Sequence, residues 1–83
     1  MSLMDPEAIE SKLIETFTTV FECDSDSQKI ATMKYKSEPA WDSFGHMSLM
    51  AQISLDFSVE LSFDEMISLL SFEDCLKFLS KGL

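Results

Sequence analysis

Glycine, cysteine and basic residues are scarce in this sequence of 83 residues, which has two glycines, two cysteines, six lysines and no arginine. So few glycines, together with 46% hydrophobic residues, favour a compact globular fold over a disordered chain. Fifteen acidic residues bring the net charge to −9, which disfavours binding to nucleic acid or to anionic membrane surfaces. The same charge either attracts partners with basic docking patches or simply keeps the protein soluble.

Long hydrophobic runs are also missing, and this excludes a membrane span. No segment approaches the roughly 20 apolar residues that cross a bilayer, and no signal peptide is evident in the acidic N-terminal segment. We therefore expect a cytoplasmic protein in which Cys23 and Cys75 are reduced thiols. The length predicts a single small domain over residues 1–83, in which a multi-step active site is hard to fit.

The first helix is predicted over residues 6–22. Asp5 can cap its free amides, Pro6 suits the first helical position, and Glu7 is favoured by the helix dipole. Apolar residues then recur at three- and four-residue steps, at Ile9, Leu13, Ile14, Phe17, Val20 and Phe21. This spacing is typical of an amphipathic helix with one buried face.

Residues 23–40 are predicted to form a long loop. Its first part is polar and turn-prone, and Pro39 disfavours helix at the residue before it. Ile30, Met33 and Tyr35 either anchor the segment on the core or form a short turn of helix. A loop of this length in so small a domain is typically functional or a crossover between distant helix ends.

The second helix is predicted over residues 43–57, and it is apolar over most of its circumference. Its core face comprises Leu49, Met50, Ile53 and Phe57. A second apolar stripe beside that face comprises Phe44, Met47, Ala51 and Leu55. The polar stripe comprises Gly45, Ser48, Gln52 and Asp56. Such a helix is either wedged between other helices or exposes part of its apolar surface as a docking site.

Two further helices complete the prediction. Ser62 and Glu65 have the spacing of a capping box for a short helix over residues 63–69. Ser71 is expected to cap a last helix over residues 72–80, which buries Phe72, Cys75, Leu76 and Leu79. No strand pattern competes with these helices. The predicted fold class is therefore all-α, a small four-helix bundle with three longer helices, one short third helix and a long first loop.

An Asp-Ser pair, Asp42-Ser43, stands where the 43–57 helix begins. Trp41 precedes the pair and Phe44 follows it, and large apolar residues come after it at Leu49, Ile53 and Phe57. This spacing, the chain length and the helix order resemble the acyl carrier protein family, the phosphopantetheine-binding carriers that include D-alanyl and aminoacyl carrier proteins. The resemblance runs from about residue 42 to residue 79.

The resemblance implies that Ser43 bears a covalent 4′-phosphopantetheine arm. A phosphopantetheinyl transferase would attach the arm from coenzyme A with the help of a divalent metal, and Asp42 would help to orient the transferase or its metal. The thiol of the arm would then hold an acyl or aminoacyl group as a thioester. The chain is thus expected to be a monomeric carrier with no catalytic residue and no metal site of its own. An activating ligase and downstream acyl-using enzymes are its expected partners.

The predicted second helix departs from family members that serve fatty acid synthesis. Those members have several acids along this helix, whereas the matching positions here hold one acid, Asp56, among uncharged residues. The negative charge is concentrated in the first helix and loop, at Glu10, Glu15, Glu22, Asp24 and Asp26. Phe44 replaces a more usual leucine, as in D-alanyl carriers, and Trp41 is similar to stand-alone carriers of specialised pathways. We therefore expect a specialised biosynthetic or cell-surface modification pathway, with docking through apolar surface at Phe44 and Met47.

Three alternatives stay open at this point. In the simplest, Ser43 is only the N-cap of its helix and Asp42 is a loop acid. In the second, the carrier fold serves as an unmodified interaction module, and in the third the chain is a small hydrolase that uses a cysteine with His46. His46 either approaches the phosphate of the arm and joins the docking surface or is an ordinary surface histidine. Cys75 is more typical of a small core residue than of a nucleophile.

Overall fold

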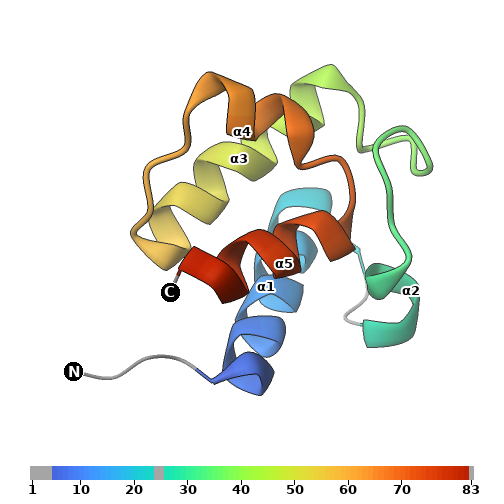
Figure 1. Cartoon of the computed structure of the whole chain (residues 1–83). Coiled ribbons are helices and arrows are strands. Elements are labelled where there is room, and N and C mark those ends of the chain that lie inside the picture. Colours follow the sequence, from blue (N-terminus) through green and yellow to red (C-terminus); the bar gives the residue numbers. More distant parts are fainter. Residues whose placement is uncertain (1–4, 24–25, 83) are drawn as a thin grey trace.

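The computed structural model describes residues 5–23 and 26–82, so Asp24, one of the acids of the predicted loop, lies outside the described residues. This part of the chain forms five helices, α1 (Pro6–Phe21), α2 (Ser27–Ala31), α3 (Ser43–Phe57), α4 (Phe63–Ser68) and α5 (Phe72–Gly82) (Figure 1). Pairing of extended backbone in the described residues is limited to an isolated bridge between Lys34 and Ser71. The all-α prediction is therefore confirmed for this part of the chain.

Four of the helices lie close to their predicted positions, and the fifth is a correction. Helix α3 has the predicted bounds, α1 and α4 each end one residue early, and α5 continues to Gly82. The difference is α2, a short helix inside the predicted loop. The Asp26 side chain caps α2 by accepting hydrogen bonds from two backbone amides in its first turn, which is why the polar segment can start a helix there. Within the described residues the prediction of four helices is thus corrected to five, and Ile30 lies in the short turn of helix that was one of its two alternatives.

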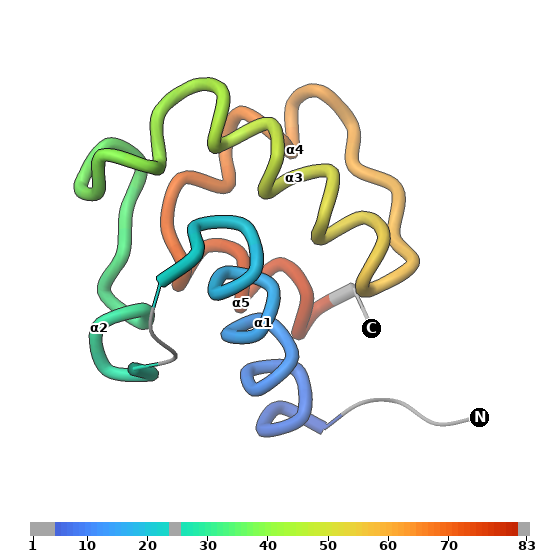
Figure 2. The backbone as a smooth tube through the Cα atoms, turned by 180° about the vertical axis from the view of Figure 1, so that it is seen from behind, coloured from blue at the N-terminus to red at the C-terminus, as the bar shows by residue number. Residues whose placement is uncertain are grey.

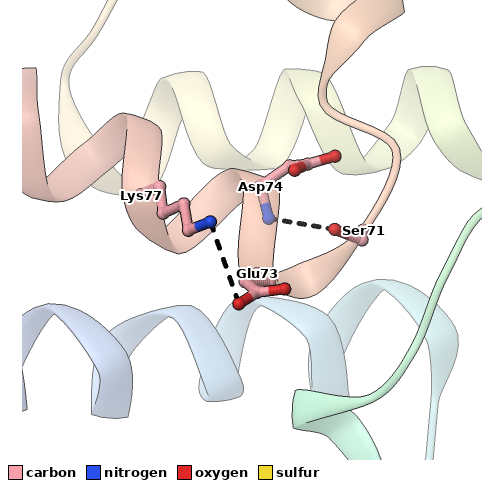
Figure 3. Close-up of polar contacts among 4 residues, drawn as sticks. All are labelled: Ser71, Glu73, Asp74 and Lys77. Atoms are coloured by element: carbon pink, nitrogen blue, oxygen red, sulfur yellow. Dashed lines mark hydrogen bonds and ion pairs between the residues drawn. The ribbon is translucent and has the colours of Figure 1, made fainter.

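Side-chain caps fix the starts of α1, α4 and α5. Asp5 accepts a hydrogen bond of 2.8 Å from a backbone amide in the first turn of α1. Ser62 and Glu65 form the reciprocal capping box of α4. At the start of α5, the backbone N–H of Asp74 donates to Ser71 Oγ at 3.0 Å (Figure 3). Each cap satisfies amides that have no partner within the helix, and these three predicted caps are confirmed.

Helix α1 is the central element, because it packs against α2, α3 and α5. Both views place α3 and α4 side by side at one end of the molecule, away from the first turn of α1 (Figures 1 and 2). Helix α4 contributes no buried residue to the core. The end of the molecule formed by α3 and α4 is therefore held mainly through the inner face of α3.

The core is a hydrophobic cluster to which α1, α2, α3, α5 and the loops contribute, and its aromatic centre joins α1, α5 and the loop before α3. Phe17 meets Phe21, Trp41 and Phe72 edge to face, with ring centroids 5.1 to 5.6 Å apart. Trp41 is fully buried although it lies in a loop. Because Trp41 directly precedes Asp42, the core anchors the chain immediately before the Asp-Ser pair.

Candidate functional site

Asp42 is the N-cap of α3. Its backbone is extended, and its Oδ1 accepts a hydrogen bond of 2.9 Å from the backbone N–H of Gly45. Ser43 is the first residue of the helix. The simplest alternative, in which Ser43 is the cap and Asp42 a loop acid, is therefore wrong. The aspartate does the capping, and the serine hydroxyl is not needed for that task.

The Ser43 side chain is exposed at the start of α3. Its Oγ lies 2.9 Å from the hydroxyl oxygen of Tyr35, at hydrogen-bonding distance. An exposed hydroxyl at the N-terminus of a 15-residue helix is at the positive end of the helix dipole, where a phosphate is favoured. The residues present thus fit a phosphate-linked arm, since the hydroxyl is accessible at the positive end of the helix and the neighbouring Asp42 carboxylate is already bonded to the Gly45 amide.

Tyr35 is a site residue that the sequence did not reveal, because it was expected only to anchor its segment on the core or to form a short turn of helix. The backbone N–H of Tyr35 donates to the carbonyl oxygen of Leu70 at 2.8 Å. The backbone N–H of Lys36 donates to the carbonyl oxygen of Trp41 at 2.8 Å, and Lys36 adopts a left-handed φ of 70° that closes this loop. These contacts bring residue 35 to the start of α3, and no local spacing in the sequence signals them.

The structure corrects both expectations for His46, because the side chain is only 7% exposed. The indole N–H of Trp41 donates to His46 Nδ1 at 3.0 Å, and His46 Nε2 lies 2.6 Å from the carbonyl oxygen of Met66. An indole N–H only donates and a carbonyl only accepts, so the ring carries its hydrogen on Nε2. Both ring nitrogens are thus used inside the protein. His46 is neither a surface histidine nor a docking residue, and it links Trp41 to α4.

Cys75 lies in an environment unlike that of an activated nucleophile, and His46 uses both of its ring nitrogens elsewhere. Burial raises the pKa of the Cys75 thiol to about 12, and the charge of Asp74 adds to this shift. A reactive cysteine needs the opposite shift, because the thiolate is the nucleophile. Cys75 is fully buried in the core, as predicted, and Cys23 is half-buried. The structure therefore offers no support for the cysteine hydrolase alternative.

The second apolar stripe of α3 faces solvent. Phe44 is 81% exposed, Met47 54% and Leu55 75%. The predicted core face of the helix, which comprises Leu49, Met50, Ile53 and Phe57, is buried. Of the two alternatives predicted for this helix, the structure therefore supports the one in which α3 exposes part of its apolar surface. Exposed apolar side chains at this spacing mark a candidate binding surface.

A groove of about 270 Å³ lies beside this stripe, between α3 and the chain that contains α4. Its lining is mainly apolar and comprises Met47, Met50, Ala51, Ser54, Leu61 and Met66. Three of these residues are methionines, whose unbranched side chains adapt their shape more readily than leucine or isoleucine. Met47 lies one helical turn beyond Ser43, so the groove begins close to the serine along α3.

Asp56, the one acidic residue of α3, is used inside the protein. Its carboxylate accepts hydrogen bonds from Thr16 Oγ1 at 2.7 Å and from Gln52 Nε2 at 2.9 Å. Thr16 belongs to α1, so the acid joins two helices. Helix α3 therefore presents apolar and uncharged polar groups to any enzyme that docks along it.

Two features are absent from the described part of the chain. Within residues 5–23 and 26–82, no three side chains of the metal-binding types gather into a site for an ion. None of the helices formed by these residues has the length and apolar character of a membrane span.

The chain was compared with protein-family models, curated proteins and solved structures, and it matches none of them. The resemblance to acyl carrier proteins therefore stays a prediction that rests on the Asp42-Ser43 pair, the spacing of apolar residues after it and the helix order.

Proposed function

We propose that this chain is a carrier protein whose cargo, an acyl or aminoacyl group, is held as a thioester on a 4′-phosphopantetheine arm attached to Ser43. One observation carries the proposal: Asp42 caps α3, and this leaves the Ser43 hydroxyl exposed at the first helical position. The cap of α3 therefore does not use the Ser43 hydroxyl. The chain itself is a substrate of the transferase and not an enzyme.

The transfer requires an accessible serine hydroxyl because it takes place in another protein's active site. Ser43 Oγ attacks the pyrophosphate of coenzyme A and forms a phosphate ester bond. The bond to the adenosine bisphosphate half of coenzyme A breaks, and the serine proton passes to a base of the transferase. Asp42 stays exposed beside Ser43 and can meet the divalent metal or a basic group of that enzyme. When attached, the arm supplies a thiol that carries the cargo.

The exposed apolar stripe supports a particular kind of partner. Enzymes that read this carrier are proposed to bind Phe44 and Met47 through apolar surface, because α3 presents no acidic patch to basic groups. These enzymes are the transferase, a ligase that activates the acid, and acyl-using enzymes downstream. We assign the carrier to a specialised biosynthetic or cell-surface modification pathway in the cytoplasm, where it acts as a monomer.

The attachment is tested by intact mass. The protein is co-expressed with a broad-specificity phosphopantetheinyl transferase, and the expected result is the added mass of one arm. Ser43→Ala abolishes this gain. Ser80→Ala, which removes an exposed serine hydroxyl from α5, is the matched control and gains the arm normally. An unmodified wild-type protein, or a Ser43→Ala variant that still gains the arm, would overturn the proposal.

Docking is tested by a pair of charge substitutions on the same exposed stripe. Phe44→Asp places a charge beside Ser43, and we expect the KM of the transferase for the carrier to rise about tenfold or more, with helicity by circular dichroism unchanged. Leu55→Asp places the same charge roughly 16 Å further along α3 and leaves the KM within twofold. Equal effects of the two substitutions would show that charge, and not the surface beside Ser43, decides docking. Loss of helicity in Phe44→Asp would show that Phe44 supports the fold.

An unmodified interaction module is the second candidate, because the exposed stripe on α3 needs no arm to bind a partner. The two candidates differ in what Ser43→Ala does. A module gains no mass from the transferase even as the wild type and keeps its partner after this substitution, whereas a carrier gains the arm as the wild type and loses both arm and cargo in Ser43→Ala. Once attachment is shown, loading assays with candidate ligases identify the acid that the arm carries.

A further inference from the structure

Tyr35 is the residue that meets the Ser43 hydroxyl, with 2.9 Å between the two oxygens. We propose that Tyr35 is a positioning residue for the transfer reaction, holding Ser43 Oγ in the orientation in which it attacks the incoming pyrophosphate. This inference rests on the proposed attachment of the arm to Ser43. It adds to that function a residue eight positions earlier, from the loop and not from α3.

The Tyr35 side chain is held by its surroundings. The ring meets the His46 ring edge to face with centroids 5.5 Å apart, and His46 is itself fixed through both of its ring nitrogens. The ammonium of Lys36 lies 5.5 Å from the centre of the Tyr35 ring. The backbone N–H of Tyr35 is bonded to Leu70. The hydroxyl is therefore presented to Ser43 at a defined point, as a positioning group requires.

Either hydroxyl can donate in this hydrogen bond. In the arrangement that serves transfer, Tyr35 donates and Ser43 Oγ accepts through one of its lone pairs. The serine proton and the other lone pair stay available to the transferase. Without Tyr35, the short side chain of Ser43 is free to turn among its staggered rotamers, and only part of the population points outward.

The Tyr35 hydroxyl also has a hydrogen-bonding role after the arm has been attached to Ser43. Once the phosphate ester has formed, Ser43 Oγ is the linking oxygen and a weaker acceptor, while the neighbouring phosphoryl oxygens carry negative charge. A hydroxyl that lay 2.9 Å from the linking oxygen is then placed to donate to a charged phosphoryl oxygen, which gives a stronger hydrogen bond. Tyr35 therefore alters the chemical environment of the phosphorus atom in the attached arm, in addition to the rate at which the arm is attached.

The test compares Tyr35→Phe with Thr32→Val. Tyr35→Phe removes the hydroxyl and keeps the ring that packs on His46. Thr32→Val also removes one hydroxyl and keeps the side-chain shape, but the Thr32 hydroxyl bonds to Lys29 and not to Ser43. With purified transferase and coenzyme A, we expect the kcat of Tyr35→Phe to fall about fivefold with the KM for the carrier within twofold, as for the loss of one hydrogen bond. Thr32→Val should match the wild type in both constants.

A second measurement does not depend on which step limits the rate. In the loaded protein, the ³¹P resonance of the ester on Ser43 should shift in Tyr35→Phe and stay unchanged in Thr32→Val. Wild-type kcat together with a wild-type ³¹P resonance in Tyr35→Phe would overturn the role of Tyr35 and leave the attachment intact. A Tyr35→Phe variant that changes only the KM would overturn it as well. If the wild-type chain accepts no arm, the proposed function itself fails, and the role of Tyr35 fails with it.

Discussion

Helices α3 and α5 both pack against α1, but they use their apolar residues in different ways. On α5 the inner side is apolar, with Phe72, Cys75 and Leu79 in the core, and the outer side is exposed and charged. On α3 the inner side is equally apolar, yet the side chains of Phe44 and Leu55 are exposed to solvent. Burial in the core accounts for the whole pattern of α5, whereas α3 keeps apolar surface that folding does not require. That surplus surface is where a partner is expected.

The polar residues of α3 sharpen the contrast with α5. Gln52 and Asp56 are half-buried and bonded to each other, and Asp56 also accepts from Thr16 of α1. The outer residues of α5 include Glu73 and Lys77, whose side chains are mostly exposed. Helix α3 therefore uses its polar groups inside the protein while its second apolar stripe faces outward, the reverse of an ordinary surface helix.

The largest expected difference within α3 is between two leucines. Leu49 is fully buried, whereas Leu55 is 75% exposed. Leu49→Ala should lower the free energy of unfolding by about 2–5 kcal/mol, because it removes buried methyl groups and leaves a cavity. Leu55→Ala should change it by less than about 0.5 kcal/mol. Urea unfolding of the two variants measures the difference, and similar losses in both would show that the outer stripe is packed.

Gly45 gives the next largest effect, because α3 approaches the preceding loop closely there. A Cβ at residue 45 would collide with the carbonyl oxygen of Ala40 and crowd the ring of Phe21. We expect Gly45→Ala to destabilise the protein by about 2 kcal/mol, although alanine is the better helix former. Ser80→Ala on the exposed side of α5 is the control and should be neutral. A stabilised Gly45→Ala variant would mean that the loop can move away at no cost.

The helices that have a clear apolar period or a capping residue could be predicted from the sequence. The apolar periodicity of α1 and the capping residues Asp5, Ser62 and Ser71 gave helix starts that the structure confirms. The core face of α3 was also predicted from spacing alone. Around Ile30 a short turn of helix was only one of two alternatives, because five residues hold too few apolar positions to show a period and the cap of α2 at Asp26 reads equally well as a turn.

The rest of the candidate site depends on contacts between residues that no local pattern connects. Gly45 was assigned to a polar stripe, but it is buried because the backbone of Ala40 lies against it. His46 was expected at the surface, and its burial follows from partners at Trp41 and Met66. Tyr35 meets Ser43 only after the loop has closed. Tertiary packing decides such positions, and helical spacing carries no information about it.

The free energy of unfolding should depend on pH through Cys75, on the core side of α5. Burial raises the pKa of its thiol from 9.0 to about 12. Below pH 9 the thiol is protonated in both the folded and the unfolded protein, so it makes no pH-dependent contribution to the free energy of unfolding. Between about pH 9 and pH 12 the unfolded chain has released the proton and the folded protein has not, so the free energy of unfolding falls by up to about 1.4 kcal/mol per pH unit.

This pH dependence can be separated from that of other groups. Lysine and tyrosine side chains titrate in the same range, so the measured quantity is the difference between wild type and Cys75→Ala across the pH window. The wild-type protein should lose stability faster with rising pH than Cys75→Ala. Parallel curves would show that the thiol is accessible to water in the folded protein.

The smallest expected effect lies on the outer side of α5, at the ion pair of Glu73 and Lys77 (Figure 3). The charged atoms are 3.9 Å apart and both side chains are about 70% exposed, so water and salt screen the attraction. Lys77→Gln should lower the free energy of unfolding by less than about 0.5 kcal/mol, and Lys81→Gln, near the end of the same helix, is the charge control. Lys77→Gln should also leave the KM of the transferase unchanged, whereas Phe44→Asp on α3 raises it. The outer sides of both helices can then be changed at little cost in stability, and only the outer side of α3 affects binding.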